Sequence, residues 1–133
     1  MKLVYPVCIY PGDESGYTVI VSDLPGCVTE GKTLAEALEQ AVDAASGWVL
    51  DELEDGKTAP PASDITSVKA DEYENGFVSV VILDMDNYAE KYGNKAVRKN
   101  CTIPAWLNTA AENAHLNFSQ ILQNALQEKL NLQ

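Results

Sequence analysis

The segment YTVIVSDLPGCVTEGKTLAEALEQAVDAASGWV, residues 17–49, places two short strands, a tight turn and a long helix in immediate succession. Residues 17–23 are rich in β-branched side chains and predict a strand, and residues 28–31 predict a second, shorter one. The LPGC sequence between them puts Pro25 and Gly26 at the two central positions of a type II turn. The segment therefore predicts paired strands that lead directly into a helix.

Residues 33–56 have the pattern of one long amphipathic helix. Thr33 and Glu36 have the spacing of a capping box at its start, and Gly56 suits its end. Most acidic side chains lie off the apolar face, so we expect the helix to cover a sheet and to present negative charge to solvent. The apolar face consists of Leu34, Leu38, Ala41, Val42, Ala45, Val49 and Leu53.

Further strands are predicted on both sides of this segment. Residues 2–10 are apolar and form a hairpin with residues 17–23, and Pro6 indicates that one edge of the first strand is locally unpaired. Residues 65–71 and 76–86 predict two more strands, of which the second is apolar almost throughout, as expected of a central strand. One sheet covered by one helix is an α+β fold.

The composition is that of an ordinary globular protein, with 46% hydrophobic and 22% charged residues among 133. No apolar run approaches the roughly 20 residues that cross a membrane. The start of the chain reads as a strand and not as a signal peptide. Cys8, Cys27 and Cys101 are widely spaced, which argues against a disulfide framework or a zinc site. We therefore expect a cytoplasmic protein with no cofactor.

Charge is divided unevenly along the chain. Residues 1–92 hold 5 basic and 18 acidic side chains, a net charge of −13, whereas residues 93–133 hold 4 basic and 2 acidic ones, a net charge of +2. Such asymmetry suggests two parts with different partners. An acidic surface also aids solubility, so composition alone leaves those partners open.

The stretch VRKNCTIP, residues 97–104, concentrates cations in this acidic chain. Residues 95–103 alternate as a strand does, with Arg98, Asn100 and Thr102 on one face. The sequence therefore predicts a short strand with a polar, partly basic outer face.

Two helices are predicted after this strand. Pro104 suits the first position of the first helix, and Asn117 suits the N-cap of the second, with Gln120 three residues later. Each helix has an apolar stripe. The stripes are Leu107, Ala110, Ala111 and Ala114 in the first, and Phe118, Ile121, Leu122, Ala125, Leu126 and Leu130 in the second.

A strand and two helices make a unit of about 40 residues, a size at which a lone core rarely suffices without a partner. We therefore expect two copies to pair their strands antiparallel as a homodimer. Such a ribbon fits the major groove of DNA, where Arg reads guanine and Asn reads adenine, while helix amides hold a phosphate. The expected DNA contacts are Lys95, Arg98, Lys99, Asn100, Thr102, Asn117, Phe118 and Ser119. The same pattern also allows the tail to pack on the first unit, with its polar face in water.

Two regions together resemble a HicB antitoxin, and the resemblance covers nearly the whole chain. Residues 17–49 are similar to the D-L-P-G-C-x-T-x-G and T-x-x-E-A-L motifs of that family. Residues 95–126, KAVRKNCTIPAWLNTAAENAHLNFSQILQNAL, resemble the ribbon-helix-helix tail of one of its branches. The order and spacing of the two motifs make the resemblance specific.

The resemblance implies a partial RNase H-like domain in residues 1–86, a linker over 87–94 and a ribbon-helix-helix domain in 95–133. In the family, the first domain binds and blocks a HicA toxin, a small basic ribonuclease that cleaves mRNA. The tail dimerises and represses its own operon by binding operator DNA, and both dimers and tetramers fit the pattern. An acidic first domain would also attract a basic toxin by electrostatic steering.

We expect no enzymatic activity, although a metal-dependent nuclease of RNase H-like fold is one alternative. Two-metal hydrolysis needs several carboxylates within a few ångströms, and the candidates are scattered over turns and strand ends. Cys27 with His115 as its base would need residues from both domains. A second alternative is an acidic binding module whose tail only oligomerises. The carboxylate candidates are Asp13, Asp23, Glu30, Asp84 and Asp86, of which Asp23 and Glu30, around the LPGC turn, are also our candidates for toxin contact.

Overall fold

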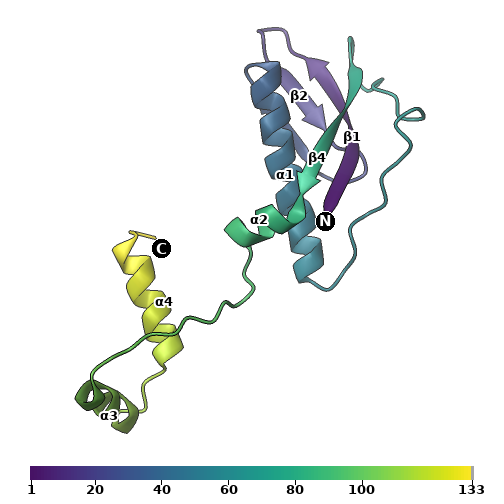
Figure 1. Ribbon diagram of the computed structural model, residues 1–133. Coiled ribbons are helices and arrows are strands. Elements are labelled where there is room, and N and C mark those ends of the chain that lie inside the picture. Colours follow the sequence, from purple (N-terminus) through teal and green to yellow (C-terminus); the bar gives the residue numbers. More distant parts are fainter. Residues whose placement is uncertain (133) are drawn as a thin grey trace. The chain divides into compact units, whose positions relative to one another are not determined.

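The computed structural model describes residues 1–132 and divides the chain into two compact units, Met1–Lys95 and a second unit that begins at Ala96 (Figure 1). The strands of the first unit are β1 (Lys2–Pro11), β2 (Tyr17–Ile20), β3 (Val28–Gly31) and β4 (Phe77–Asp84). They form one antiparallel sheet in the order β3-β2-β1-β4, and one long helix lies along one face of it. The predicted α+β combination of a small sheet and a long helix is confirmed for this unit.

Strand β1 is the centre of the sheet because it has a neighbour on each side. Six consecutive residues of β1, from Tyr5 to Tyr10, are buried. At Pro6 the strand pairs only with Val80 of β4, since the pairing with β2 begins at Cys8. The missing N–H of proline therefore costs no ladder hydrogen bond to β2, and the predicted local gap on one edge is confirmed.

Two strand predictions were wrong in detail. Strand β4 is an edge strand and not a central one, because β1 is its one neighbour in the sheet. Its apolar run alternates in burial, with Val81 buried and Ile82 exposed, so the run did not indicate burial on both faces. Residues 65–71 form no strand, because the carboxylate of Asp64 accepts hydrogen bonds from the amide and hydroxyl of Thr66 and folds the chain into a turn.

The LPGC turn has the predicted type II geometry. The amide of Cys27 donates to the carbonyl of Leu24 at 2.9 Å, which closes a four-residue turn. Gly26 has a φ of +81°, a conformation that the third position of a type II turn requires and that glycine adopts without strain.

Helix α1 (Leu34–Glu54) begins and ends where the sequence predicts. The hydroxyl of Thr33 accepts from the amide of Glu36 at 3.1 Å, and Gly56 ends the helix with a φ of +79°. The amides of Gly56 and Lys57 donate back to carbonyls of the last turn, at 3.1 and 2.9 Å, as in a Schellman motif. Neither α1 nor another helix within residues 1–132 is long and apolar enough to cross a membrane.

The buried face of α1 consists mainly of small residues, because the helix lies close to the sheet. Ala37, Ala41 and Ala45 are fully buried, whereas the predicted face residue Leu34 is 37% exposed. Gly31 sets this distance: a Cβ atom at Gly31 would lie 2.4 Å from the backbone nitrogen of Ala37. Only glycine allows the end of β3 and the first turn of α1 to approach so closely.

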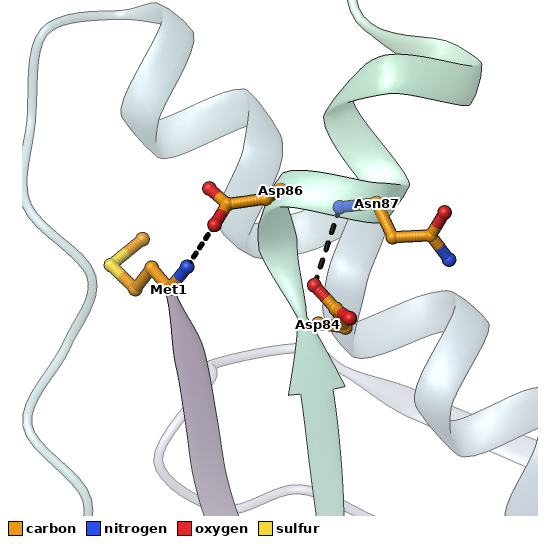
Figure 2. Close-up of polar contacts among 4 residues, drawn as sticks. All are labelled: Met1, Asp84, Asp86 and Asn87. Carbon is orange, nitrogen blue, oxygen red and sulfur yellow. Dashed lines mark hydrogen bonds and ion pairs between the residues drawn. The ribbon is translucent and has the colours of Figure 1, made fainter.

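Helix α2 (Met85–Tyr92) occupies most of the predicted linker over residues 87–94. Figure 2 shows why the chain turns into a helix here: the carboxylate of Asp84 accepts from the amide of Asn87 at 3.3 Å, as an N-cap. The predicted strand over 76–86 therefore ends two residues early. The carboxylate of Asp86, in the first turn of α2, pairs with the amino group of Met1.

The second unit contains helix α3 (Ala105–Asn113) and helix α4 (Phe118–Lys129). Asn117 is the N-cap of α4, as predicted, and its side chain accepts from the amide of Gln120 at 3.0 Å. Pro104 was expected at the first helical position of α3, but it is the N-cap residue, one position earlier. His115 follows the end of α3 and has a φ of +55°, the left-handed conformation that often terminates a helix.

We predict that Gly31→Ala lowers the free energy of unfolding by about 1–3 kcal/mol, because the added methyl group collides with backbone that cannot move away. Urea denaturation of the full chain measures this change. Gly16→Ala is the matched control, since its Cβ would meet the carbonyl oxygen of Gly31 at an ordinary 3.5 Å. Equal stability of the two variants would contradict the close packing of β3 on α1.

Candidate functional site

The second unit exposes nearly all of its apolar side chains. Within residues 96–132 no residue is buried, and only Asn108 and Ala111 are even partly covered. Helices of a stable globular unit bury one stripe against a neighbour, and this unit lacks such a neighbour within itself. The large exposed apolar residues are Val97, Ile103, Trp106, Leu107, Leu116, Phe118, Ile121, Leu122, Leu126, Leu130 and Leu132.

The residues proposed to contact DNA lie in the same unit, except Lys95, which is the last residue of the first unit, and all of them are exposed. Lys95, Arg98, Lys99, Asn100 and Thr102 fall on a segment without helix or strand. A strand needs a hydrogen-bonded neighbour, and the expected neighbour is a second copy of the chain. Because this neighbour would come from a second chain, the antiparallel pairing of residues 95–103 stays a prediction.

The start of α4 brings three more of the predicted contacts together. The side chain of Asn117 is engaged in capping the helix. The amides of Phe118 and Ser119 belong to the first turn of α4, where helix geometry offers an N–H group no acceptor of its own. These two amides are the groups that could donate to an anion at this end of the helix.

The first unit has an acidic pocket of about 560 Å³ at one end of its sheet. The pocket lies between the turn from β1 to β2, the end of β3 and the first turn of α1. The carboxylates of Glu14, Glu30 and Glu36 line it, together with one cation, Lys32. This arrangement gives Glu30 the surroundings that a basic side chain of a partner protein would favour.

Asp23 lies apart from this pocket. Its carboxylate accepts from the amide and the hydroxyl of Ser63, at 2.8 and 2.5 Å. Since Glu30 pairs with Thr18 near the start of β2 and Asp23 follows the end of β2, the two acids lie at opposite ends of the β2–β3 pair. The structure therefore does not bring the two proposed toxin contacts together, and it gives Asp23 an internal hydrogen-bonding role.

The long segment from Lys57 to Gly76, in which the sequence predicted a strand over residues 65–71, is held to the sheet at several points. The Tyr5 hydroxyl donates to the carbonyl of Pro60 at 2.6 Å, and the Tyr10 hydroxyl accepts from the amide of Glu72 at 3.3 Å. The rings of Tyr10 and Tyr73 meet edge to face with centroids 5.3 Å apart. Burial raises the pKa of both Tyr5 and Tyr10, so these hydroxyls stay protonated.

The carboxylates considered for a nuclease have separate places in the fold. Asp84 caps α2, Asp86 pairs with the amino group of Met1, and Asp23 binds Ser63. Within the described residues 1–132, no three His, Cys, Asp or Glu side chains are grouped as metal ligands. Nothing in this arrangement favours two-metal hydrolysis.

Cys27 has the surroundings of a structural residue and not of a nucleophile. Cys27 is the last residue of the LPGC turn, its side chain is buried, and burial raises the pKa of its thiol. A reactive cysteine needs the opposite shift, toward a stable thiolate. Sequence reasoning could not predict this, because burial of the position follows from the sheet and helix together.

A family model described as HicB_like antitoxin of bacterial toxin-antitoxin system matches residues 5–125. The chain belongs to this HicB-like antitoxin family. It is 36% identical over 106 residues to an uncharacterized 14.9 kDa protein of the rep-hol intergenic region in Haemophilus phage HP1, covering 79% of this chain and 76% of the phage protein. The family predicted from the two sequence motifs is thus confirmed.

Solved structures of toxin–antitoxin complexes contain chains with a similar fold. A chain of the toxin–antitoxin complex from Streptococcus pneumoniae matches with a TM-score of 0.72 and 28% identity, covering 97% of this HicB-like chain and 99% of that one. A chain of the HicA3 and HicB3 toxin–antitoxin complex matches with a TM-score of 0.52 and 26% identity, over 62% of this chain and 99% of that one. The likeness to the first complex covers both units of this antitoxin.

We predict that the Cys101→Ser variant of this antitoxin has no fast-reacting thiol at neutral pH. Cys8 and Cys27 are buried, and the raised pKa of Cys27 keeps its thiol protonated until the pH rises further. Titration with a disulfide reagent measures this, and denaturation in urea should release both thiols as the control. A thiol that reacts rapidly in the folded variant and disappears in Cys27→Ala would contradict the structural role of Cys27.

Proposed function

We propose that this HicB-like antitoxin neutralises a HicA-type ribonuclease with its first unit and represses its own operon through its tail. The observation that carries the proposal is the exposed apolar surface of the tail beside a short basic segment. In the first unit most large apolar side chains are buried or partly buried, whereas within residues 96–132 no residue is buried. The apolar surface of the tail therefore needs a partner. We assign the tail to the ribbon-helix-helix class and the first unit to the partial RNase H-like class.

The partner of the tail is a second copy of the chain. Burying one large apolar side chain contributes roughly 1.5–3 kcal/mol, and the tail leaves side chains such as Leu122, Leu126 and Ile121 between 39 and 53% exposed. A two-fold arrangement covers the same stripes on both copies at once. It also gives residues 95–103 the hydrogen-bonded neighbour that a strand requires.

The paired segments would read DNA in the major groove. Alternation then puts the two copies of Arg98, Asn100 and Thr102 on one outer face, where arginine suits guanine and asparagine suits adenine. The amides of Phe118 and Ser119 would hold a backbone phosphate and fix the position of the ribbon. With few cations near the ribbon, we expect modest affinity that depends strongly on salt and on several dimers binding together.

The first unit would bind the toxin by charge and by surface fit. Residues 1–92 have a net charge of −13, so a small basic ribonuclease would be steered toward them. The pocket beside Glu30 offers a place for a basic side chain, and we keep Asp23 as a second candidate contact despite its bond to Ser63. The negative charge would also keep this unit away from DNA and leave the ribbon as the one region suited to approach phosphate.

We predict that Arg98→Ala weakens binding to the operon's own promoter at least about tenfold, since one good base contact contributes roughly 1–3 kcal/mol. A gel-shift titration at fixed salt measures the change. Lys57→Ala is the matched control, because it removes an exposed cation of the first unit and should leave DNA affinity unaltered. Equal affinity of Arg98→Ala and the unaltered chain would refute base reading by Arg98.

We predict that a fragment ending at Lys95 keeps toxin binding and loses the assembly made by the tail. All of the buried core residues among residues 1–132 lie within this fragment, so it should fold alone. Co-purification with the small basic ribonuclease of the same operon tests binding, and sedimentation tests assembly. A folded fragment that fails to retain the toxin would place the toxin surface on the tail and overturn this division of roles.

A further inference from the structure

A groove of about 250 Å³ lies where α1, α2 and the end of β4 meet in the first unit. Its walls combine carboxylates with aromatic rings: Glu39 and Asp43 come from α1, Asp84 from β4, and Tyr88 and Tyr92 from α2. Sites for small molecules usually have volumes of roughly 300–1,000 Å³. The smaller volume of this groove suits one side chain of a partner protein better than a free ligand.

The three carboxylates of the groove have no basic partner. Within residues 1–132 no salt bridge joins any of them to a cation, although Lys91 also lines the groove. Glu39 and Asp43 are four residues apart on α1, a spacing at which like charges destabilise a helix. Asp84 accepts from the amide of Asn87 through Oδ1 and has Oδ2 left for another donor (Figure 2). A cation in the groove would therefore relieve repulsion and bind oxygens that are ready to accept.

Two tyrosines of α2 supply the aromatic wall. The rings of Tyr88 and Tyr92 have centroids 4.8 Å apart and are tilted by 45°. Tyr88 lies close against α1, because a Cβ atom at Gly47 would be 3.1 Å from its hydroxyl oxygen. Burial raises the pKa of Tyr88, and the carboxylate of Asp43 raises it further, so the hydroxyl stays protonated. Tyr92 is 61% exposed, which leaves much of its ring available for stacking.

We infer that this groove receives an arginine side chain of the toxin, an inference that rests on the toxin binding proposed above. The guanidinium group stacks on the ring of Tyr92, and its N–H groups donate to the carboxylates of Asp43 and Asp84. Arginine suits the groove better than lysine, because a guanidinium is planar, weakly hydrated and presents five donors in a fixed fork. Carboxylates bind such a fork through two parallel hydrogen bonds.

An exposed stripe of α1 connects this groove with the pocket beside Glu30. Glu36 lines that pocket, whereas Glu39 and Asp43 line the groove. These three acids follow one another at spacings of three and four residues, so they are neighbours on the helix surface and span about 10 Å along its axis. The toxin thus meets a continuous acidic surface with a cavity at each end, and the side chain in the groove fixes its orientation.

Dissociation rates of full-chain variants from the small basic ribonuclease of the same operon test the inference. Asp43→Asn and Tyr92→Ala should each speed dissociation at least about tenfold, because removing one partner of a covered charge contact acts mainly on the dissociation rate. Asp71→Asn is the matched control, since it removes the same charge from an exposed position outside the groove. It should leave the dissociation rate unaltered in surface plasmon resonance.

Two further variants distinguish a shared guanidinium from separate contacts. Tyr92→Phe retains the ring and should dissociate as slowly as the unaltered chain. The double variant Asp43→Asn/Tyr92→Ala should lose less than the product of the two single effects, because both side chains contact one cation. Asp43 and Tyr92 are both exposed, so the variants should fold, and urea denaturation checks this.

The outcomes separate this inference from the proposed function. If the unaltered chain binds the toxin but Asp43→Asn and Tyr92→Ala dissociate no faster than Asp71→Asn, the groove is not a toxin contact and the proposed function stands. If the unaltered chain does not bind the toxin, the proposed neutralisation fails and this inference fails with it. A changed sedimentation rate of Tyr92→Ala without toxin would show that a second copy covers the groove, and would overturn the inference.

Discussion

The first unit depends on the close contact between α1 and the sheet. Gly31 lets the backbone of β3 reach the first turn of α1, and the alanines of the helix continue that contact toward β1. This contact fixes which side of α1 faces solvent. The helix is held with its acidic side toward solvent. The segment between the helix and β4 is held to the rest of the unit by hydrogen bonds to Tyr5, Tyr10 and Asp23.

The second unit shows what happens when a chain lacks such a contact. Its helices have capped ends and regular apolar stripes, yet none of its residues within 96–132 is buried. Local rules are sufficient to start and stop these helices, but packing free energy comes from removing apolar area from water. The apolar stripes of such a tail are covered only in an assembly, and the proposed DNA binding therefore depends on a partner for the tail.

Separation of charge connects the two units. Negative charge on the first unit suits a basic protein partner, whereas Arg98 and its neighbours lie on a segment that can approach phosphate. The same distribution limits where two antitoxin chains can touch, because like charges oppose contact except at neutral surfaces. The apolar stripes of the tail form such a surface. The proposed pairing of two tails therefore depends on the absence of charge there as much as on the presence of apolar area.

The sequence by itself determined the features that depend on neighbouring residues. The type II turn at Gly26, the ends of α1 at Thr33 and Gly56, and the cap of α4 at Asn117 all follow from local hydrogen bonds and backbone preference. The family followed from the order and spacing of the two sequence motifs in residues 17–49 and 95–126. Tertiary structure decided what depends on distant residues. It made β4 an edge strand, although its apolar sequence predicts a central strand. It also placed Asp23 in a hydrogen bond with Ser63 and at the opposite end of the β2–β3 pair from Glu30. Pattern reveals which side chains are apolar or charged, but only packing between remote segments decides which of them water still reaches.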